Sequence, residues 1–374
     1  MVETADVVVI GAGLVGLATA YELAGRDVAT LVVERDRIGA GASSAGAGLL
    51  APISDWESAE PFLGICRDAR DLWRPWLAAV VAESGLEVES DRSGCLMVEL
   101  DTDDERLLDR EIDYADRAGE SWEPLPLSEA RLRIPALAPA VRRVVLLHGE
   151  HRIDNVAACA ALATACRRRG VTIREGVAVE RVEVAANRVA LATSRGDRIE
   201  ATAAVLAAGA WSGGIAGAPP LPVRPVRGQM IRLGGAPWPF LGSVRGANGY
   251  AVRRGASSLL VGATVEEAGF DAVTTAAGIR SLLSFAAELF PGLDPAPLEA
   301  SWAGLRPGSP DGRPLLGRLD GGPLVAACGH FRNGILLAPW TGIEIARHLA
   351  DGTPISGGDL FAPDRFSRAA ASPE

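Results

Sequence analysis

The chain has 374 residues, which is enough for two domains that share a sizeable core. It carries 37 basic and 47 acidic residues, a net charge of −10, and every basic residue is Arg because the sequence contains no Lys. Such a surface repels phosphate backbones, which argues against a nucleic-acid partner. With 48% hydrophobic and 22% charged residues, the composition is that of a globular protein.

Neither a disulfide framework nor a membrane anchor is indicated. The cysteines form an odd set without a C-x-x-C pair, which predicts reduced thiols in a cytoplasmic protein: Cys66, Cys95, Cys159, Cys166 and Cys328. The apolar runs are shorter than the roughly 18 to 20 residues of a membrane span. Glu3 and Asp6 stand where a signal peptide would have basic residues.

The first elements in chain order form one βαβ unit. Residues 6–10 (DVVVI) have the apolar, β-branched pattern of a strand buried on both faces of a parallel sheet. A G-A-G-L-V-G turn follows at 11–16 and leads into a helix that extends to residue 23. Residues 28–33 predict a second buried strand, which ends at Glu34.

Farther along the chain, the sequence predicts further helices and strands in alternation. An amphipathic helix is expected at 59–85, then strands at 95–100 and 144–148 around a charged helix at 103–119. Asp154 and Asn155 predict the start of a helix that extends to 169. The remaining expectations are a strand at 171–173, a three-stranded meander at 179–199, a strand at 203–208, short strands within 219–254, a helix at 272–289, a strand at 323–327 and a helix at 334–349.

These segments predict an α/β protein of two interleaved domains. A Rossmann-like dinucleotide-binding domain takes residues 1–85, 149–218 and 305–374. An α+β substrate domain, built on a mainly antiparallel sheet, takes residues 86–148 and 219–304.

The glycine turn has the chemistry of a pyrophosphate site. Gly11 permits the tight turn, Gly13 removes the side chain at closest approach, and Gly16 lets the helix pack on the strand. The amides and the helix dipole then face the phosphates. Glu34 lies at the distance along the chain at which a carboxylate accepts ribose hydroxyls, and it disfavours a 2′-phosphate. Glycine triplets also occur by chance in turns, but here strand, helix and acidic residue are all in place.

The next segment distinguishes between dinucleotides. Residues 39–50 (GAGASSAGAGLL) consist almost wholly of Gly, Ala and Ser, so backbone amides can approach a flat ligand that extends from the first site. A flexible loop is the alternative. A dissociable nicotinamide needs no such long contact, which favours flavin.

Several strings together resemble the glycine oxidase branch of the D-amino acid oxidase superfamily. They are the glycine turn, the 39–50 segment, S-W-A-G-L-R-P-G at 301–308, D-G-R-P at 311–314 and G-H-F-R-N-G-I-L-L-A-P at 329–339. The resemblance implies non-covalent FAD, oxidation of a small amine or amino acid, and molecular oxygen as electron acceptor. It also implies the residues that contact the cofactor: Gly11, Gly13, Leu14, Val15, Gly16, Glu34, Arg35, Ala42, Ser43, Ser44, Ala47, Gly48, Leu49, Val179, Gly209, His330, Phe331, Arg332, Asn333, Gly334, Ile335 and Leu336.

Three residues are candidates for substrate binding. Arg306 is flanked by Gly304, Pro307 and Gly308, a rigid setting in which a guanidinium can hold a carboxylate through two parallel hydrogen bonds. A structural ion pair accounts for the residue equally well, and the resemblance makes it the carboxylate anchor, assisted by Arg332. Tyr250 lines the substrate cavity by the same resemblance, or is a half-buried strand aromatic.

The segment at 329–334 precedes an expected helix, so its amides can face negative charge on a reduced flavin. His148 and His151 lack a third ligand, so we expect solvent-facing side chains and no metal site. No side chain is assigned as a catalytic acid or base, because positioning and cofactor electronics supply the catalysis.

The predicted reaction is hydride transfer from the α-carbon of a small amino acid or amine to FAD. The products are an imine that hydrolyses to the 2-oxo acid and ammonia, and hydrogen peroxide. Residues 244–249 (VRGANG) lack the histidine associated with this branch, which leaves glycine, sarcosine, cyclic imino acids and D-amino acids open as substrates.

Two alternatives stay open. One is a dehydrogenase or biosynthetic amine oxidase that passes electrons or imine to a pathway partner, such as the thiazole branch of thiamine synthesis. The other is a flavin-bound structural subunit without turnover. The sequence also leaves a homo-oligomer open.

Overall fold

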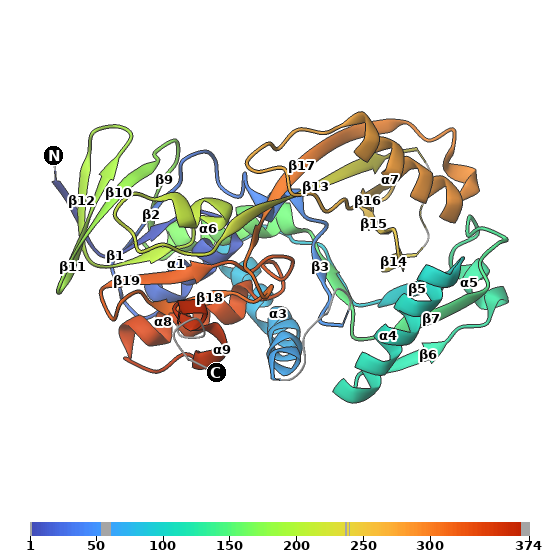
Figure 1. The fold of residues 1–374 in the computed structure, drawn as a ribbon, viewed down its shortest axis with the longest axis horizontal. Helices are drawn as coiled ribbons and strands as arrows, with labels where there is room; N and C mark the ends of the chain where they lie inside the picture. Colours follow the sequence, from blue (N-terminus) through green and yellow to red (C-terminus); the bar gives the residue numbers. More distant parts are fainter. Residues whose placement is uncertain (1, 54–60, 236–237, 239, 368–374) are drawn as a thin grey trace.

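The structure, a computed structural model, describes residues 2–53, 61–235, 238 and 240–367. Figure 1 shows an elongated molecule in two halves, with the first strand, β1 (Val2–Ile10), and the last helix, α9 (Gly358–Phe361), in the same half. Each half contains its own large sheet, and the chain crosses between the halves several times.

The first sheet is mainly parallel at its centre. Strands β9, β2, β1, β12 and β19 run parallel in that order, and the antiparallel strands β10, β11 and β18 extend its edges. Its strands are β1 (Val2–Ile10), β2 (Thr30–Val33), β9 (Thr172–Arg174), β10 (Val179–Ala185), β11 (Arg188–Thr193), β12 (Arg198–Leu206), β18 (Leu315–Arg318) and β19 (Leu324–Cys328).

The second sheet is mainly antiparallel and has the order β17-β13-β16-β15-β14-β5-β7-β6, with β14 and β5 parallel. Its strands are β5 (Cys95–Glu99), β6 (Trp122–Pro124), β7 (Arg143–Leu147), β13 (Arg224–Leu233), β14 (Ser243–Gly246), β15 (Gly249–Arg254), β16 (Ser258–Gly262) and β17 (Leu298–Gly308). A small third sheet joins β3 (Leu49–Leu50), β8 (His151–Ile153) and β4 (Ser90–Asp91).

The helices cover the sheets. They are α1 (Leu14–Ala24), α2 (Ala42–Ala45), α3 (Phe62–Ser84), α4 (Thr102–Ala118), α5 (Leu127–Arg133), α6 (Asn155–Arg168), α7 (Ala276–Leu289), α8 (Ala338–Ala350) and α9 (Gly358–Phe361), with 3₁₀ turns η1 (Gly209–Gly214) and η2 (Pro291–Leu293). Helices α1, α3, α6 and α8 pack together on the first sheet, and α7 packs on the second. The α/β class and the mainly antiparallel second sheet are therefore as predicted.

Local sequence explains where several elements begin and end. Asp154 caps α6, because its carboxylate accepts hydrogen bonds from the amides of Val156 and Ala157. Helix α4 likewise begins after Asp101 and ends at Gly119, which has a left-handed backbone. The predicted meander is present, but its third strand does not stop at residue 199. Strand β12 extends to Leu206 without interruption because no turn residue separates the two predicted strands.

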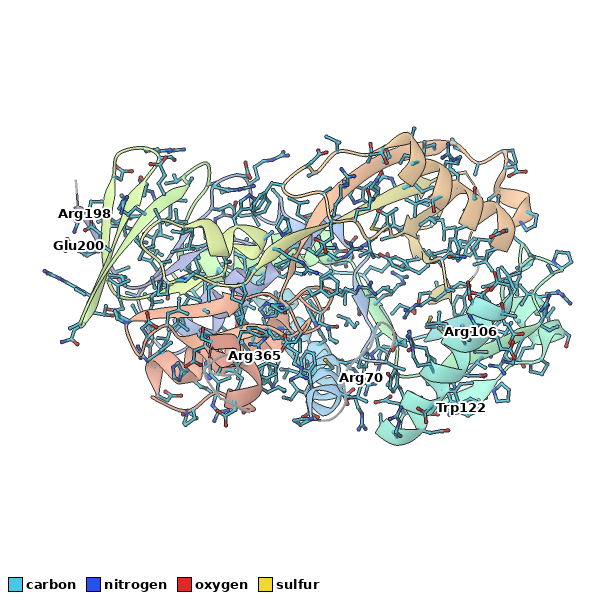
Figure 2. The ribbon with its side chains drawn as sticks, in the orientation of Figure 1. Arg70, Arg106, Trp122, Arg198, Glu200 and Arg365 are labelled. Atoms are coloured by element: carbon cyan, nitrogen blue, oxygen red, sulfur yellow. The ribbon has the colours of Figure 1, made fainter. Side chains whose placement is uncertain are left out.

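The two halves are joined by buried polar contacts as well as by the chain. Figure 2 labels Arg70 on α3, between the two halves. Its guanidinium donates hydrogen bonds to Glu120 (2.7 Å) and to the carbonyl of Gly149 (3.0 Å). Strand β17 is a further link, and the predicted boundary between residues 304 and 305 falls inside it. The domain limits stay a prediction.

Candidate active site

A cavity of about 740 Å³ extends along the junction of the two halves. This volume is typical of a site for a small organic ligand. One end is lined by the glycine turn after β1 and by Glu34, and the other by residues of β13, β15 and β17. The cavity therefore runs from the first sheet to the second.

The glycine turn is built by the register of the two parallel strands. Ile10 pairs with Val33, so Gly11 and Glu34 leave the sheet at the same edge. Gly11 has φ +110°, and a Cβ there would lie 2.5 Å from the carbonyl oxygen of Ala207. A Cβ on Gly16 would lie 2.0 Å from the carbonyl oxygen of Gly11, so Gly16 is required for the close packing of the helix against the turn.

Glu34 is held by backbone amides. Its carboxylate accepts hydrogen bonds from the amides of Ala12 (2.7 Å) and Asp36 (2.9 Å). The adjacent Arg35 places its guanidinium 3.5 Å from the ring centroid of Trp211, and Trp211 stacks on Phe270. All these side chains contribute to the cavity wall.

The Gly, Ala and Ser segment is a tethered turn and not a flexible loop. It contains the short helix α2 and strand β3. The hydroxyl of Ser43 accepts a hydrogen bond from the amide of Leu14 (2.9 Å), and Asn155 donates to the carbonyls of Ser43 (2.7 Å) and Gly46 (3.0 Å). Helix α6 therefore fixes this segment against the glycine turn.

The segment at 329–336 forms a second wall of the cavity, but it is not the helix start predicted at Gly334. Helix α8 begins four residues later, at Ala338, with Pro339 in its first turn, where a missing N–H is tolerated. His330 is buried and lies 3.1 Å from the Thr341 hydroxyl through Nε2. Burial lowers the pKa of His330 to about 3, so this imidazole is neutral.

The three predicted substrate-binding residues line the same cavity. Arg306 is half-buried on β17 and donates from Nη1 to the carbonyl of Thr264 (3.1 Å). Tyr250 is half-buried on β15, and its hydroxyl lies 3.8 Å from the sulfur of Met230. Arg332 lies in the 329–336 wall and is more exposed than the other two.

Most of the predicted cofactor residues also line the cavity: Gly11, Gly13, Val15, Glu34, Arg35, Ala42, Ser43, Ala47, Gly48, Leu49, Val179, Gly209 and the residues from His330 to Leu336. Leu14, Gly16 and Ser44 lie outside the wall. Leu14 packs its side chain into the core, and Gly16 packs against Gly11.

Sequence reasoning missed Arg245, Trp211 and Phe270, which also line the cavity. Arg245 is buried on β14, opposite Tyr250 in the register. A charged residue in a short apolar strand was the available signal for it. Trp211 and Phe270 lie far apart in the sequence, so no local pattern indicates that they stack on each other.

The two histidines predicted to face solvent differ from each other. His148 is exposed and lies 3.5 Å from Glu123, whereas His151 is half-buried in β8. Burial lowers the pKa of His151 to about 4. Within the described residues, no cluster of three or more metal-ligating side chains is present. In the same part of the chain, no helix is long and apolar enough to cross a membrane.

A parallel sheet with a glycine turn and a carboxylate at the end of its second strand, joined to an antiparallel sheet across one cavity, is the arrangement of a dinucleotide-binding protein. Residues 6–348 match the family described as FAD dependent oxidoreductase, and the chain belongs to this family.

Curated relatives align over nearly the whole chain. A glycine oxidase from Pseudomonas putida is 32% identical over 96% of this chain and 98% of its own length. A bifunctional protein ThiO/ThiG from Synechocystis is 33% identical over 98% of this chain and 55% of its own length. The crystal structure of glycine oxidase from Geobacillus kaustophilus superposes with a TM-score of 0.90 at 30% identity, covering 97% of this chain and 99% of the other.

The residues of the cavity fit FAD. The turn at Gly11 and Gly13 leaves backbone amides without side chains over them, and Glu34 offers a carboxylate to a ribose. The tethered turn at 42–49 and the wall at 330–336 offer mainly backbone and apolar surface to a flat ring system.

Proposed function

We propose that this chain is an FAD-dependent oxidase of glycine or another small amino acid or amine, such as sarcosine or a D-amino acid. Molecular oxygen accepts the two electrons and becomes hydrogen peroxide, and the imine hydrolyses to a 2-oxo acid and ammonia, or methylamine where the substrate is sarcosine. The observation that carries the proposal is the half-buried guanidinium of Arg306 in one cavity with the glycine turn. The relatives named glycine oxidase support the same substrate class.

In this proposal Arg306 binds the carboxylate and thereby orients the α-carbon. A guanidinium is always charged and can offer two parallel N–H donors, which fixes a planar acid group in one orientation. Arg332 assists from the neighbouring segment, which is joined to β17 by the hydrogen bond from the amide of Phe331 to the carbonyl of Pro307 (2.8 Å), and Tyr250 limits the space beside the substrate. FAD, when bound, supplies the two-electron oxidation by accepting hydride from that carbon.

The proposal needs no side-chain base. Of the described residues in the cavity wall, the carboxylates are Glu34 and Asp36, both beside the glycine turn. The wall's histidine, His330, is neutral and buried. Substrate enters the reactive form when its amine is neutral, and Arg306 keeps it in place.

Replacement of Arg306 by Leu tests the proposal. We expect kcat/KM for glycine to fall by roughly 30-fold to several thousand-fold, which corresponds to about 2 to 5 kcal/mol. The reason is that the substrate carboxylate is then buried without its charged partner. FAD content and melting temperature should stay close to wild type. Wild-type kcat/KM in a folded, FAD-bound Arg306→Leu enzyme would refute the carboxylate-anchor role.

The second candidate is an FAD-dependent dehydrogenase, or a biosynthetic amine oxidase, that passes electrons or imine to a pathway partner. The biosynthetic role is favoured by the relative in which the matching region forms about half of a bifunctional protein. An oxygen electrode separates an oxidase from a dehydrogenase. An oxidase consumes oxygen at the rate of substrate loss, whereas a dehydrogenase consumes it slowly and still reduces an artificial acceptor.

The cellular setting belongs to the same proposal. All five cysteines are buried free thiols, which supports a reducing, cytoplasmic location. The homo-oligomeric state is open to measurement by light scattering.

A further inference from the structure

Arg306 does not simply project from its strand, because its side chain lies across the neighbouring strand β13. In the register of β13 and β17, Arg306 pairs with Val226 and Gly304 pairs with Gly228. A Cβ on Gly228 would lie 2.2 Å from Nη1 of Arg306 and 2.5 Å from its Cζ and Nη2. The guanidinium therefore occupies the space that a side chain at position 228 would fill.

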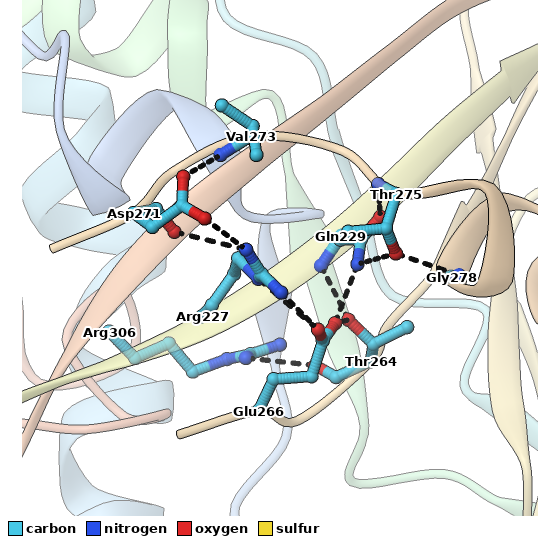
Figure 3. Close-up of polar contacts among 9 residues, drawn as sticks. All are labelled: Arg227, Gln229, Thr264, Glu266, Asp271, Val273, Thr275, Gly278 and Arg306. Atoms are coloured by element: carbon cyan, nitrogen blue, oxygen red, sulfur yellow. Dashed lines mark hydrogen bonds and ion pairs between the residues drawn. The ribbon is translucent and has the colours of Figure 1, made fainter. Parts of the chain in front are cut away.

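The far end of the guanidinium is held by a third segment. Beyond β16 the chain continues beside β13, and Glu266 and Arg227 exchange two backbone hydrogen bonds of 2.9 Å. Thr264 lies on this segment, and its carbonyl accepts the hydrogen bond from Nη1 of Arg306, as Figure 3 shows. Arg306 thus spans from β17 over Gly228 to Thr264.

A polar network fixes the position of Thr264 (Figure 3). Its hydroxyl accepts from the amide of Gln229 (2.8 Å) and donates to Glu266 (2.5 Å). The other oxygen of Glu266 accepts from Arg227 (2.6 Å), and Gln229, which is fully buried, donates to Glu266 (2.7 Å). Removal of one member of such a network leaves buried polar groups unsatisfied and moves the others.

We propose that Gly228 and Thr264 are positioning residues that set the orientation of the Arg306 guanidinium, and hence of the substrate carboxylate. The inference rests on the proposed function, in which Arg306 binds that carboxylate. Gly228 provides the space in which the guanidinium lies, and the carbonyl of Thr264 fixes one of its nitrogens, so the remaining donors face a defined direction. Gly228 and Thr264 have uncharged side chains and act on the substrate through Arg306.

Acetate binding to the FAD-bound enzyme tests the inference without turnover. Acetate carries the carboxylate of glycine and no amine, and its binding is followed by the change in flavin absorbance. In Gly228→Ala we expect at least about tenfold weaker acetate binding, the loss of one hydrogen bond to a charged group. KM for glycine should rise by a similar factor, with a smaller change in kcat.

Two further variants make the test specific. Thr264→Val keeps the side-chain shape and removes the hydroxyl, so acetate binding should weaken by about threefold or more as the carbonyl shifts. Gly292→Ala makes the same chemical change as Gly228→Ala where a Cβ meets nothing within 4 Å. It lies in η2, away from the cavity wall, and should keep wild-type acetate affinity.

The outcomes separate the inference from the proposed function. If Arg306→Leu retains wild-type acetate affinity, the anchor role itself fails. If Arg306→Leu weakens acetate binding and Gly228→Ala does not, the anchor role stands and the positioning inference is overturned. Should Gly228→Ala fail to fold with FAD, Thr264→Val decides, and wild-type acetate affinity in that variant overturns the inference.

Discussion

Replacement of Gly13 by Ala separates cofactor binding from folding. Gly13 is the N-cap of α1 with φ −75° and ψ 177°, a conformation that alanine adopts without strain. The added methyl would meet only the Ser43 hydroxyl, at 2.9 Å. The fold should therefore accept the substitution, at a cost of about 1 kcal/mol to the FAD-free protein, because Ser43 must move and give up its 2.9 Å hydrogen bond from the amide of Leu14.

The larger cost falls on FAD. The methyl covers the backbone at the point where the pyrophosphate comes closest, so FAD loses a hydrogen bond between its phosphate and the backbone. A hydrogen bond to a charged group contributes about 2 kcal/mol. FAD binding should therefore weaken by roughly 30-fold.

The assay is titration of FAD-free protein with FAD, followed by quenching of flavin fluorescence. Gly16→Ala is the contrasting variant, because its Cβ would lie 2.0 Å from the carbonyl oxygen of Gly11. Gly16→Ala should therefore lower the melting temperature of the FAD-free protein itself. Wild-type FAD affinity in Gly13→Ala would refute the assignment of the cavity end at Gly13 to the pyrophosphate.

Two further predictions concern stability. Because the pKa of His330 is about 3 in the fold and about 6.5 in the unfolded chain, only the unfolded chain takes up the proton between these pH values. Stability therefore decreases as the pH is lowered from about 6.5 towards 3. In urea titrations, the free energy of unfolding of the wild type should fall by about 2 kcal/mol more between pH 6.5 and pH 5 than that of His330→Gln. Equal losses in the two proteins would contradict the burial of a neutral His330. Glu120→Gln should lower stability by about 2 kcal/mol, because the buried Arg70 loses the carboxylate of Glu120 and keeps that of the exposed Asp71. The control is Arg106→Gln on α4 (Figure 2), because Arg106 and its partner Asp103 are 80% and 70% exposed; its loss should be less than about 0.5 kcal/mol. Equal losses of stability in Glu120→Gln and Arg106→Gln would contradict the prediction.

The half built on the first sheet was the easiest part to predict from sequence, because its signals are local. An apolar strand, a glycine turn, a helix and an acidic residue lie within residues 6–34, and the register of Ile10 with Val33 follows from one βαβ crossover. The Asp154 cap is likewise local, and it marks the start of α6. The resemblance extended this prediction to residues 39–50 and 329–339, and most residues of both segments line the same cavity.

Features that depend on contacts between distant segments could not be predicted in the same way. The crossing of Arg306 over Gly228 joins residues about eighty positions apart, and nothing near either residue signals it. The start of α8 was placed too early, because G-H-F-R-N-G was interpreted as a helix entry whereas the chain makes a further turn before Pro339. Arg245 was overlooked because its strand is too short to show an alternating pattern.

If this chain oxidises a small amine or amino acid by means of FAD bound in the cavity between the two sheets, a substrate alone must reduce its flavin. Anaerobic mixing of the purified, FAD-reconstituted protein with glycine, sarcosine, D-alanine and D-proline measures that reduction. We expect at least one of them to abolish the visible absorbance of the flavin, and air then to restore the colour with formation of hydrogen peroxide. A protein that stays colourless after reconstitution, or a flavin spectrum that none of the four changes, would contradict it.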